Sequence, residues 1–291
     1  MDVSDVEIKG NTITNDITTA SEFKAVDIDV DSEGTGVEIS GNKIYVSAAV
    51  KQTLVFLRNI CASAENPARI YNNQVSGVGG VGSSSALKIN GEKFANLDIA
   101  YNTFMMNGTA SSSLVSIVHD AENINFVDNI FANRNDGVVI EFGGNLDSSV
   151  KFTSDVFESQ GNNLISVAEA YKTFEEFTAL QSVSGCFKEN VQFFSNEVLS
   201  PVSKGSLLSA VPLAYVTTDI TGAARNITTP TIGAYEYESS VSAPVIAKGF
   251  PEVRNVSASR ADVAVVTDIS GKVYVMAQKE EVAVPYAEEI K

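Results

Sequence analysis

Charged and amide side chains recur at six nearly evenly spaced positions, where they could bind or act on an extended polymer. The six positions are Glu7, Glu38, Arg69, Asp98, Asn125 and Lys151. If consecutive positions lie on neighbouring strands about 4.8 Å apart, Arg69 stands between the carboxylates of Glu38 and Asp98. This arrangement is typical of a plain ladder of cross-strand ion pairs, which adds little stability, and the alternative is a carbohydrate site. Tyr71 would add an aromatic surface on which a sugar ring can stack.

A second cluster of possible ligands surrounds the sole histidine, His119. The acids that follow it are Asp120, Glu122, Asp128, Asp136 and Glu141. Three or more carboxylate oxygens can hold a calcium ion, so Asp120, Glu122 and Asp128 are the predicted metal ligands, and calcium is the one cofactor considered. The alternative is that these acids are simply solvated, as loop acids in so acidic a chain usually are.

A repeated pattern, roughly V-x-I-x-x-N-x-I, must position these side chains. The copies are VEIKGNTI at 6, VEISGNKI at 37, ARIYNNQV at 68, LDIAYNTF at 97, INFVDNIF at 124 and VKFTSDVF at 150. Their central residues are Asn11, Asn42, Asn73, Asn102, Asn129 and Asp155, at successive spacings of 31, 31, 29, 27 and 26 residues. Such a period predicts a repeat architecture. Asn at the same corner of every turn predicts a ladder of side-chain hydrogen bonds, which should weaken at Asp155.

The spacing of apolar residues predicts strands. Each copy alternates apolar and polar residues, as in Val37, Glu38 and Ile39, which is typical of a strand with one buried face. Further short apolar runs begin at residues 25, 53, 86, 114, 138 and 164, so each turn contains at least two strands. One turn cannot bury its apolar face alone, and we therefore expect like strands to stack in parallel along a coil over residues 1–170.

The N-x-I turns resemble those of right-handed parallel β-helix proteins, the pectate-lyase-like superfamily. The resemblance covers residues 1 to about 170 and implies an all-β, right-handed solenoid. Lyases, hydrolases, phage tailspikes and adhesins share these turns, so they indicate fold more than activity. In the lyases, acids hold calcium and an Arg or Lys on an outer sheet face removes a proton beside a uronate. The resemblance thus makes Arg69 or Lys151 the candidate catalytic base. Glu38, Tyr71 and Asp98 are then the candidate carbohydrate-binding residues.

Residues 171–237 depart from the repeat and predict a C-terminal cap. Thr173 and Glu176 have the spacing of a capping box at the start of a short helix. Further on, Asp219, Arg225 and Glu236 follow the order of a D-x-x-G-x-x-R … I-G-A-x-E motif, which resembles the closing motif of bacterial secreted and surface β-helix proteins. We expect Arg225 to form a forked bond to Asp219 or Glu236 and to pin this segment across the last open turn. A ligand site at these residues is the alternative.

The chain beyond Tyr237 predicts a second module. Residues 238–243 are small and polar and indicate a linker, and residues 244–291 alternate in strand fashion around a DISGK turn. These strands resemble the start of a fibronectin-type or related β-sandwich, at roughly half the usual length. Because Val6 already belongs to a turn, the chain also starts abruptly, and we expect both ends to lie within a longer gene product.

Composition narrows the range of partners. The 291 residues include 36 acids and 20 bases, and the formal charge of −16 disfavours nucleic acid and anionic membranes. No segment is apolar enough for a membrane span. Of the two cysteines, Cys61 is expected to be buried and unpaired. We expect a monomeric, secreted or cell-surface protein that engages a polysaccharide or cell-surface glycan. The alternatives are a noncatalytic adhesin or structural spacer, and a calcium-dependent lyase acting on an acidic glycan.

Overall fold

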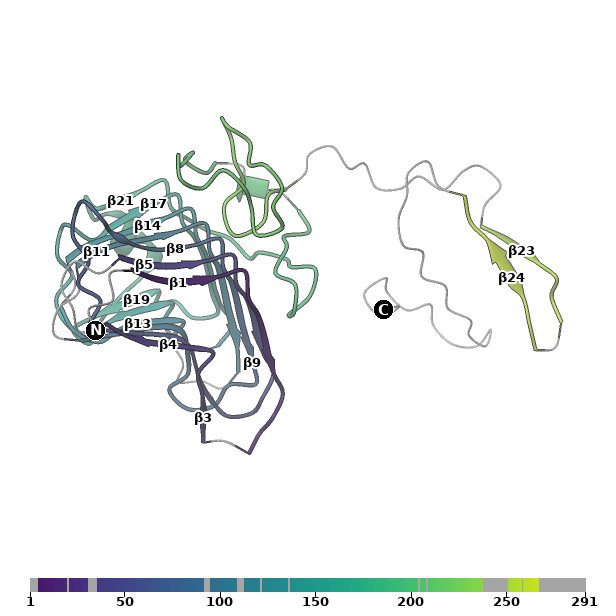
Figure 1. Ribbon diagram of the computed structural model, residues 1–291, viewed down its shortest axis with the longest axis horizontal. Helices are drawn as coiled ribbons and strands as arrows, with labels where there is room; N and C mark the ends of the chain where they lie inside the picture. Colours follow the sequence, from purple (N-terminus) through teal and green to yellow (C-terminus); the bar gives the residue numbers. More distant parts are fainter. Residues whose placement is uncertain are drawn as a thin grey trace. The chain divides into compact units, whose positions relative to one another are not determined.

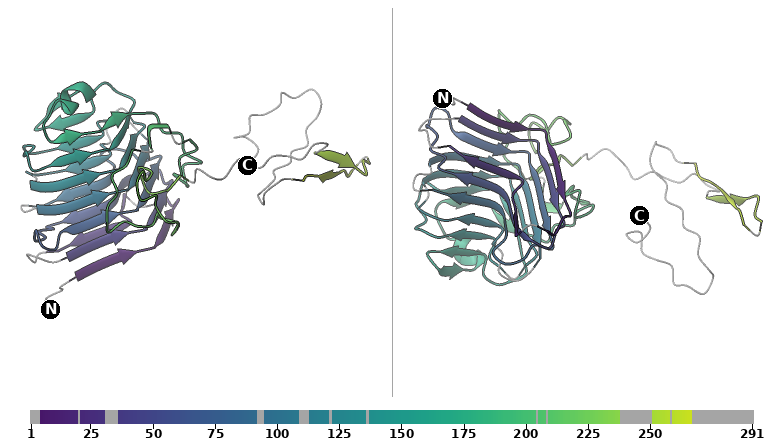
Figure 2. Two further views of the ribbon diagram at one scale, coloured as in Figure 1. Left: turned by 90° about the horizontal axis from the view of Figure 1, so that it is seen from above. Right: turned by 60° about the horizontal axis from the view of Figure 1, so that its bottom comes forward.

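The chain divides into two units, Met1–Tyr237 and Glu238–Lys291. The computed structural model describes residues 5–19, 21–30, 36–91, 95–108, 113–120, 122–135, 137–203, 205–207, 209–237, 251–257 and 259–266. The first unit is a parallel β-solenoid, in which the strands of successive turns stack on one another (Figures 1 and 2). The predicted all-β solenoid is therefore confirmed.

Each copy of the repeated pattern forms two strands with a corner between them. The strands before the corner form sheet A, in the order β1 (Asp5–Lys9), β5 (Gly36–Ser40), β8 (Ala68–Tyr71), β11 (Ala95–Ala100), β14 (Glu122–Val127), β17 (Lys151–Thr153) and β21 (Val183–Ser184). The strands after it form sheet B, in the order β2 (Thr12–Asn15), β6 (Lys43–Val46), β9 (Gln74–Val78), β12 (Thr103–Asn107), β15 (Ile130–Asn133), β18 (Val156–Ser159) and β22 (Phe187–Lys188). The period of the sequence is thus the period of the coil.

The apolar runs between the copies form a third sheet, sheet C. Its strands are β3 (Glu22–Phe23), β4 (Val26–Asp29), β7 (Lys51–Arg58), β10 (Ser85–Asn90), β13 (Val115–Ile117), β16 (Ile140–Phe142), β19 (Ile165–Val167) and β20 (Ala170–Lys172). All of them pair in parallel except β20, which turns back antiparallel to β19. A complete turn therefore has three strands, where the sequence indicated at least two.

A short helix closes one end of the core. Helix α1 (Phe174–Thr178) begins with the predicted capping box, in which Thr173 and Glu176 bond to each other's backbone N–H groups. Its Phe177 is fully buried, and the ring lies 5.0 Å from Phe152 and 5.4 Å from Phe157. These two rings belong to β17 and β18, so α1 covers the apolar interior beside the last strands of sheets A and B.

The predicted asparagine ladder is confirmed. The Nδ2 groups of Asn11, Asn42, Asn73 and Asn102 each donate to Oδ1 of the next asparagine, at 2.9–3.0 Å. The last asparagine, Asn129, donates in the same way to Asp155 Oδ1 at 2.8 Å, so the expected weakening at Asp155 is not seen in these distances. From Asn42 onward, each Nδ2 also donates to a strand carbonyl of the preceding turn. Each Oδ1 from Asn42 to Asp155 also accepts the backbone N–H of the preceding ladder residue, so the ladder satisfies backbone groups at a corner that lies outside the strands.

A left-handed residue precedes every ladder position and makes the sharp corner. These residues are Gly10, Gly41, Asn72, Tyr101, Asp128, Ser154 and Gly185, with φ between 53° and 66°. Gly185 and Cys186 reveal a seventh copy of the corner, with β21 and β22 on either side. The sequence comparison missed this copy because α1 interrupts the run between it and Asp155, and because Cys replaces Asn.

Asp155 ends the asparagine series as a buried acid. Its Oδ1 accepts two bonds from Asn129, while Oδ2 has no hydrogen-bond partner among the described residues. In the earlier turns, the corresponding atom is an Nδ2 donor. Burial raises the pKa of Asp155 well above its usual value, and the neighbouring Asp128 carboxyl adds to the effect. The folded protein therefore favours the protonated side chain, which mimics asparagine by offering a donor at Oδ2.

Replacement of this acid, Asp155→Asn, should stabilise the protein at high pH. Because the folded-state pKa is raised, the stability contributed by the wild-type side chain is present below the unfolded pKa of about 3.9 and is lost as the pH rises through the folded pKa. The melting temperatures of the two proteins should therefore agree near pH 4, and the variant should melt roughly 2–4 °C higher at pH 8. Circular dichroism melts across this range provide the measurement. The exposed control Asp147→Asn should not reproduce the trend, and a difference that stays constant with pH would refute this account.

Two further predictions concern Cys61 and the second unit. Cys61 is half-buried, and its neighbours Ile60 and Ala62 take the inward positions, so the expectation that Cys61 is buried is wrong. In the second unit, the described residues contain one antiparallel pair, β23 (Glu252–Arg254) and β24 (Asp262–Ala264). The predicted linker at 238–243 and the DISGK turn lie outside the described residues. Within the described part of the chain, no helix has the length and apolar character needed to span a membrane.

Candidate functional site

The register of sheet A places the six predicted positions in one outward column. Consecutive Cα partners run Glu7, Glu38, Arg69, Asp98, Asn125 and Lys151. A second outward column, two residues further along each strand, runs Lys9, Ser40, Tyr71, Ala100, Val127 and Thr153. The residues between the columns, such as Ile8, Ile39 and Ile70, point into the core. The alternation of each strand therefore fixes which side chains face outward.

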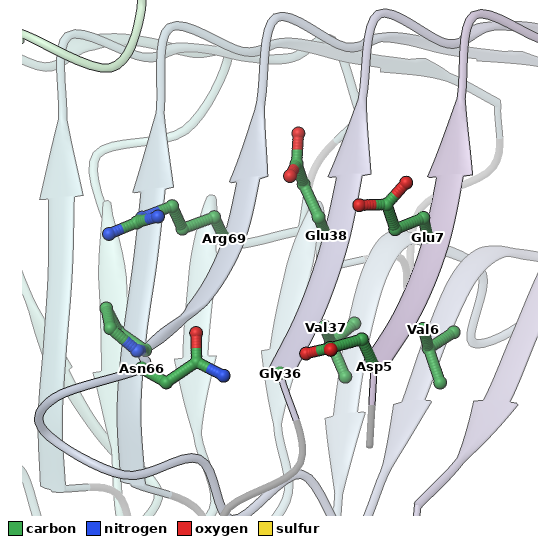
Figure 3. Close-up of a pocket in the computed structure, with 9 residues that line it drawn as sticks. Asp5, Val6, Glu7, Gly36, Val37, Glu38, Asn66 and Arg69 are labelled. Atoms are coloured by element: carbon green, nitrogen blue, oxygen red, sulfur yellow. The ribbon is translucent and has the colours of Figure 1, made fainter. Parts of the chain in front are cut away.

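Two neighbouring hollows lie along the outer face of sheet A. The first, here called the acidic hollow, is lined by Asp5, Val6, Glu7, Gly36, Val37, Glu38, Asn66, Pro67 and Arg69 (Figure 3). The second, here called the amide hollow, is lined by Ala64, Pro67, Asn96, Asp98, Asn123, Asn125, Ser148, Ser149 and Lys151. Pro67 lines both hollows, and together they extend from β1 to β17 across the strands. All the candidate catalytic and carbohydrate-binding residues except Tyr71 line one hollow or the other.

Glu38 is held as a carboxylate by three donors. Its oxygens accept hydrogen bonds from Lys9 at 2.9 Å, from Ser40 at 3.1 Å and from the Tyr71 hydroxyl. Partial burial acts to raise the pKa of Glu38, but these donors outweigh it and hold the pKa below the usual value. Glu38 is thus ionised at neutral pH and acts as an acceptor at the edge of the acidic hollow.

Arg69 does not form the ion pairs that its register suggested. Figure 3 shows its guanidinium directed away from Glu38. It lies instead over the ring of Tyr215, 4.8 Å from the centroid, and no ion pair of Arg69 is present among the described residues. Asp98, on the other side, accepts a hydrogen bond from Asn125 Nδ2 at 2.8 Å. The predicted ladder of ion pairs across Glu38, Arg69 and Asp98 is therefore wrong, although the three residues are adjacent.

The aromatic surface beside the column is shared by two tyrosines. Tyr71 packs edge-on against Tyr215 at 5.7 Å, and its hydroxyl is engaged by Glu38, so it is only partly exposed. Tyr215, which comes from the C-terminal part of the unit, was not singled out by the sequence. It could not have been, because no repeat pattern connects it with sheet A.

The two candidate bases lie far apart. Lys151 is exposed on β17, at the far end of the amide hollow. Three strand steps separate it from Arg69 on β8, which corresponds to roughly 14 Å at the usual strand spacing. Their backbone positions therefore face different parts of a polymer that lies across the strands.

The predicted metal ligands do not converge. Asp120 is exposed and accepts a hydrogen bond from the Asn145 N–H, and Glu122 is exposed at the start of β14. Asp128 is fully buried at the corner, where both of its oxygens accept from the Val211 N–H at 2.9 and 3.1 Å. Burial raises the pKa of Asp128 to about 7. Within the described residues, no group of three or more His, Cys, Asp or Glu side chains is arranged to hold a metal ion, and Asp136 lies outside them.

The C-terminal segment, residues 189–237, covers a flank of the solenoid, beside the corner between sheets A and B (Figure 2). Its buried residue Arg225 donates to Asn72 Oδ1 at 2.7 Å and lies 3.9 Å above the ring of Tyr101. Further along the corner, the Gly233 N–H donates to the Asp128 carbonyl at 2.8 Å. The expectation that Arg225 pins this segment across the last open turn is therefore wrong, since the contacts of Arg225 and Gly233 lie on three middle turns.

The closing-motif residues bond within the segment. Arg225 makes a single contact with Glu236, at 3.4 Å, and donates to the carbonyls of Thr231 and Gly233. Asp219 accepts the backbone N–H of Glu236 at 2.9 Å and has no direct bond to Arg225 among the described contacts. Gly233 has φ of 93°, and a side chain there would collide with Ile130 and Thr103. The motif thus folds the segment and docks it against the flank, as a structural role requires.

Sequence reasoning also missed the rim of the amide hollow. Asn96 and Asn123 occupy equivalent positions, two residues before Asp98 and Asn125 of the outward column. Aligning the copies of the repeat would have shown that Asn96 and Asn123 share a position, but only the positions two and four residues further along each strand were compared.

No protein-family model, curated protein or solved structure matches this chain.

Proposed function

We propose that the first unit binds a polysaccharide along the outer face of sheet A. The observation that carries this proposal is the pair of adjoining hollows, which share Pro67 and run across the strands. A polymer lying in this direction meets a new strand, and a new set of polar side chains, about every 4.8 Å. The spacing is comparable with the length of one sugar ring, so successive rings can make similar contacts.

The chemistry of the hollows supports this partner. Their polar side chains include carboxylates that accept hydrogen bonds, amides that donate and accept, and the serine hydroxyls. Sugar hydroxyls need both kinds of partner. Tyr215 and Tyr71 form a half-buried aromatic pair beside Arg69, and the edge of this pair that stays exposed can contact a sugar ring. The resemblance of the turns and of the closing motif to secreted and surface β-helix proteins favours an extracellular or cell-surface protein, which we propose acts as a monomer.

Binding without cleavage agrees best with the geometry. A lyase of the resembling superfamily would need a base beside acids that hold calcium. Arg69 lies on Tyr215, Lys151 stands three strands away, and the described acids form no metal-binding group. We therefore propose a glycan-binding role, in which the solenoid is a rigid scaffold for an extended surface.

The double variant Asp98→Ala/Asn125→Ala tests this proposal. It removes one hydrogen-bonded pair from the centre of the amide hollow, so affinity for the bound glycan should fall roughly tenfold. A glycan array identifies the ligand, and isothermal titration calorimetry measures its affinity. The control Lys88→Ala/Glu141→Ala removes one positive and one negative side chain from the outer face of sheet C. It should leave the affinity for the glycan unchanged.

Three outcomes would contradict the proposal. Absence of binding across a broad glycan panel would favour a structural spacer. An equal loss in the sheet C control would place the site elsewhere. Release of unsaturated, ultraviolet-absorbing products from a uronate polymer, abolished by Arg69→Ala or Lys151→Ala, would show that the protein is a lyase.

A further inference from the structure

We infer that the amide hollow selects uncharged glycans and rejects polyuronates, an inference that rests on the proposed function. The hollow has a volume of about 520 Å³, twice that of the acidic hollow at about 260 Å³. It is thus the larger of these two sites on sheet A and within the usual size range of small-ligand sites. Its lining decides which kind of sugar it accepts.

The lining consists of two short columns of mainly uncharged polar groups. The floor column is Asp98, Asn125 and Lys151, and the rim column is Asn96, Asn123 and Ser149. The rim is held together because Ser149 Oγ accepts the backbone N–H of Asn123 at 2.8 Å. Four of the six side chains are amides or hydroxyls, which donate and accept hydrogen bonds without attracting charge.

The rim amides are positioned by their backbone. Asn96 and Asn123 both adopt left-handed conformations, with φ of 61° and 51°, which asparagine tolerates better than most residues. Asn96 Nδ2 also donates to the Ala62 carbonyl at 2.8 Å, which fixes its amide group. The Asn96 amide is therefore fixed, and Asn123 has the same backbone conformation one strand further on, so successive hydroxyl groups of a polymer can reach the two amides.

Charge across the two hollows opposes an acidic polymer. The described lining contains four carboxylates, Asp5, Glu7, Glu38 and Asp98, and two cations, Arg69 and Lys151. The whole chain, these groups included, carries a formal charge of −16. A polyuronate would bring one further negative charge for each ring, so the protein's field repels it. An uncharged chain avoids this repulsion and still satisfies the amide and hydroxyl groups.

The test compares glycans that differ in charge. The probes are polygalacturonate, the same polymer with its carboxylates fully methyl-esterified, and a panel of neutral glucans, galactans, mannans and xylans. We expect at least one uncharged probe to bind, with an affinity that changes less than twofold between 50 and 500 mM NaCl. Polygalacturonate should bind at least tenfold more weakly than that probe, and its binding should not improve at low salt.

A single substitution assigns this selectivity to the rim. Asn123→Gly removes the amide and keeps the left-handed backbone, so the affinity for the uncharged probe should fall about three- to tenfold without loss of folding. Asn59→Gly, at a similar φ of 55° at the end of β7, is the matched control and should have no effect on binding. Tighter binding of polygalacturonate than of every neutral probe, or no effect of Asn123→Gly, overturns the inference and leaves glycan binding intact. If no glycan of either kind binds, the proposed function fails as well.

Discussion

Asn102→Ala should lower the free energy of unfolding by roughly 2–6 kcal/mol. Asn102 is fully buried in the middle of the ladder. Its Oδ1 accepts the backbone N–H of Asn73 at 3.0 Å, and its Nδ2 donates to the Ile70 carbonyl at 2.7 Å. Alanine leaves the Asn73 N–H buried without its acceptor, which costs about 1–3 kcal/mol. It also removes two further buried bonds of Asn102 Nδ2, to the Ile70 carbonyl and to Asn129 Oδ1, each worth about 0.5–1.5 kcal/mol. Urea denaturation followed by far-ultraviolet circular dichroism measures the loss.

The first residue of the ladder provides a matched control. Asn11 has the same type and the same corner position, but it is exposed, and it donates only to Asn42 Oδ1 and to the Lys9 carbonyl. Its backbone N–H still reaches Asn42 in the alanine variant. Asn11→Ala should therefore cost less than about 1 kcal/mol. If the two variants lost the same free energy of unfolding, the ladder would be a consequence of the coiled fold and would not stabilise it.

The ladder also explains why the fold could be predicted from the sequence. Each turn repeats the same chemical requirement, so a copy that departs from the pattern can still be aligned with the copies on either side of it. The register of Glu38, Arg69 and Asp98 follows directly from counting residues from Asn42, Asn73 and Asn102. The seventh corner at Cys186 escaped because helix α1 breaks the count. Features that repeat could thus be predicted from the sequence, whereas a single departure from the period could not.

The contacts of the candidate site were less accessible, because they depend on a segment outside the repeat. Counting places Arg69 between two carboxylates, but Tyr215 draws its guanidinium away from them. Likewise, Asp128 had the sequence environment of a metal ligand, yet residues 189–237 cover it and the Val211 N–H binds it. A repeat predicts which residues share a face. It does not predict which of them a later, non-repeating segment will cover.

Arg225→Leu should release that segment. The Arg225 side chain is 3% exposed, and it donates to Asn72, Thr231, Gly233 and Glu236. Burial lowers the pKa of the guanidinium, and Tyr101 and the nearby acids Glu236, Asp219 and Asp128 counteract this effect. Loss of the cation removes the counter-charge of the buried Glu236 and a hydrogen-bond donor from three other oxygens, so docking of residues 189–237 should weaken by about 3–5 kcal/mol. Limited proteolysis with mass spectrometry should then detect cleavage in residues 189–237, while the turns of the solenoid resist.

Burial, rather than the number of ion pairs, should decide the size of this effect. Arg58 on sheet C makes two ion pairs, with Asp27 at 2.8 Å and Asp29 at 2.7 Å, whereas Arg225 makes one. The Arg58 side chain is 35% exposed, however, and water can solvate the two carboxylates that remain when Arg58 is replaced. Arg58→Leu should therefore cost at most about 1 kcal/mol and should not increase cleavage of residues 189–237. If Arg58→Leu proves as damaging as Arg225→Leu, or if residues 189–237 stay protected without Arg225, the anchor of this segment must lie in its apolar contacts around Tyr101 and Ile232.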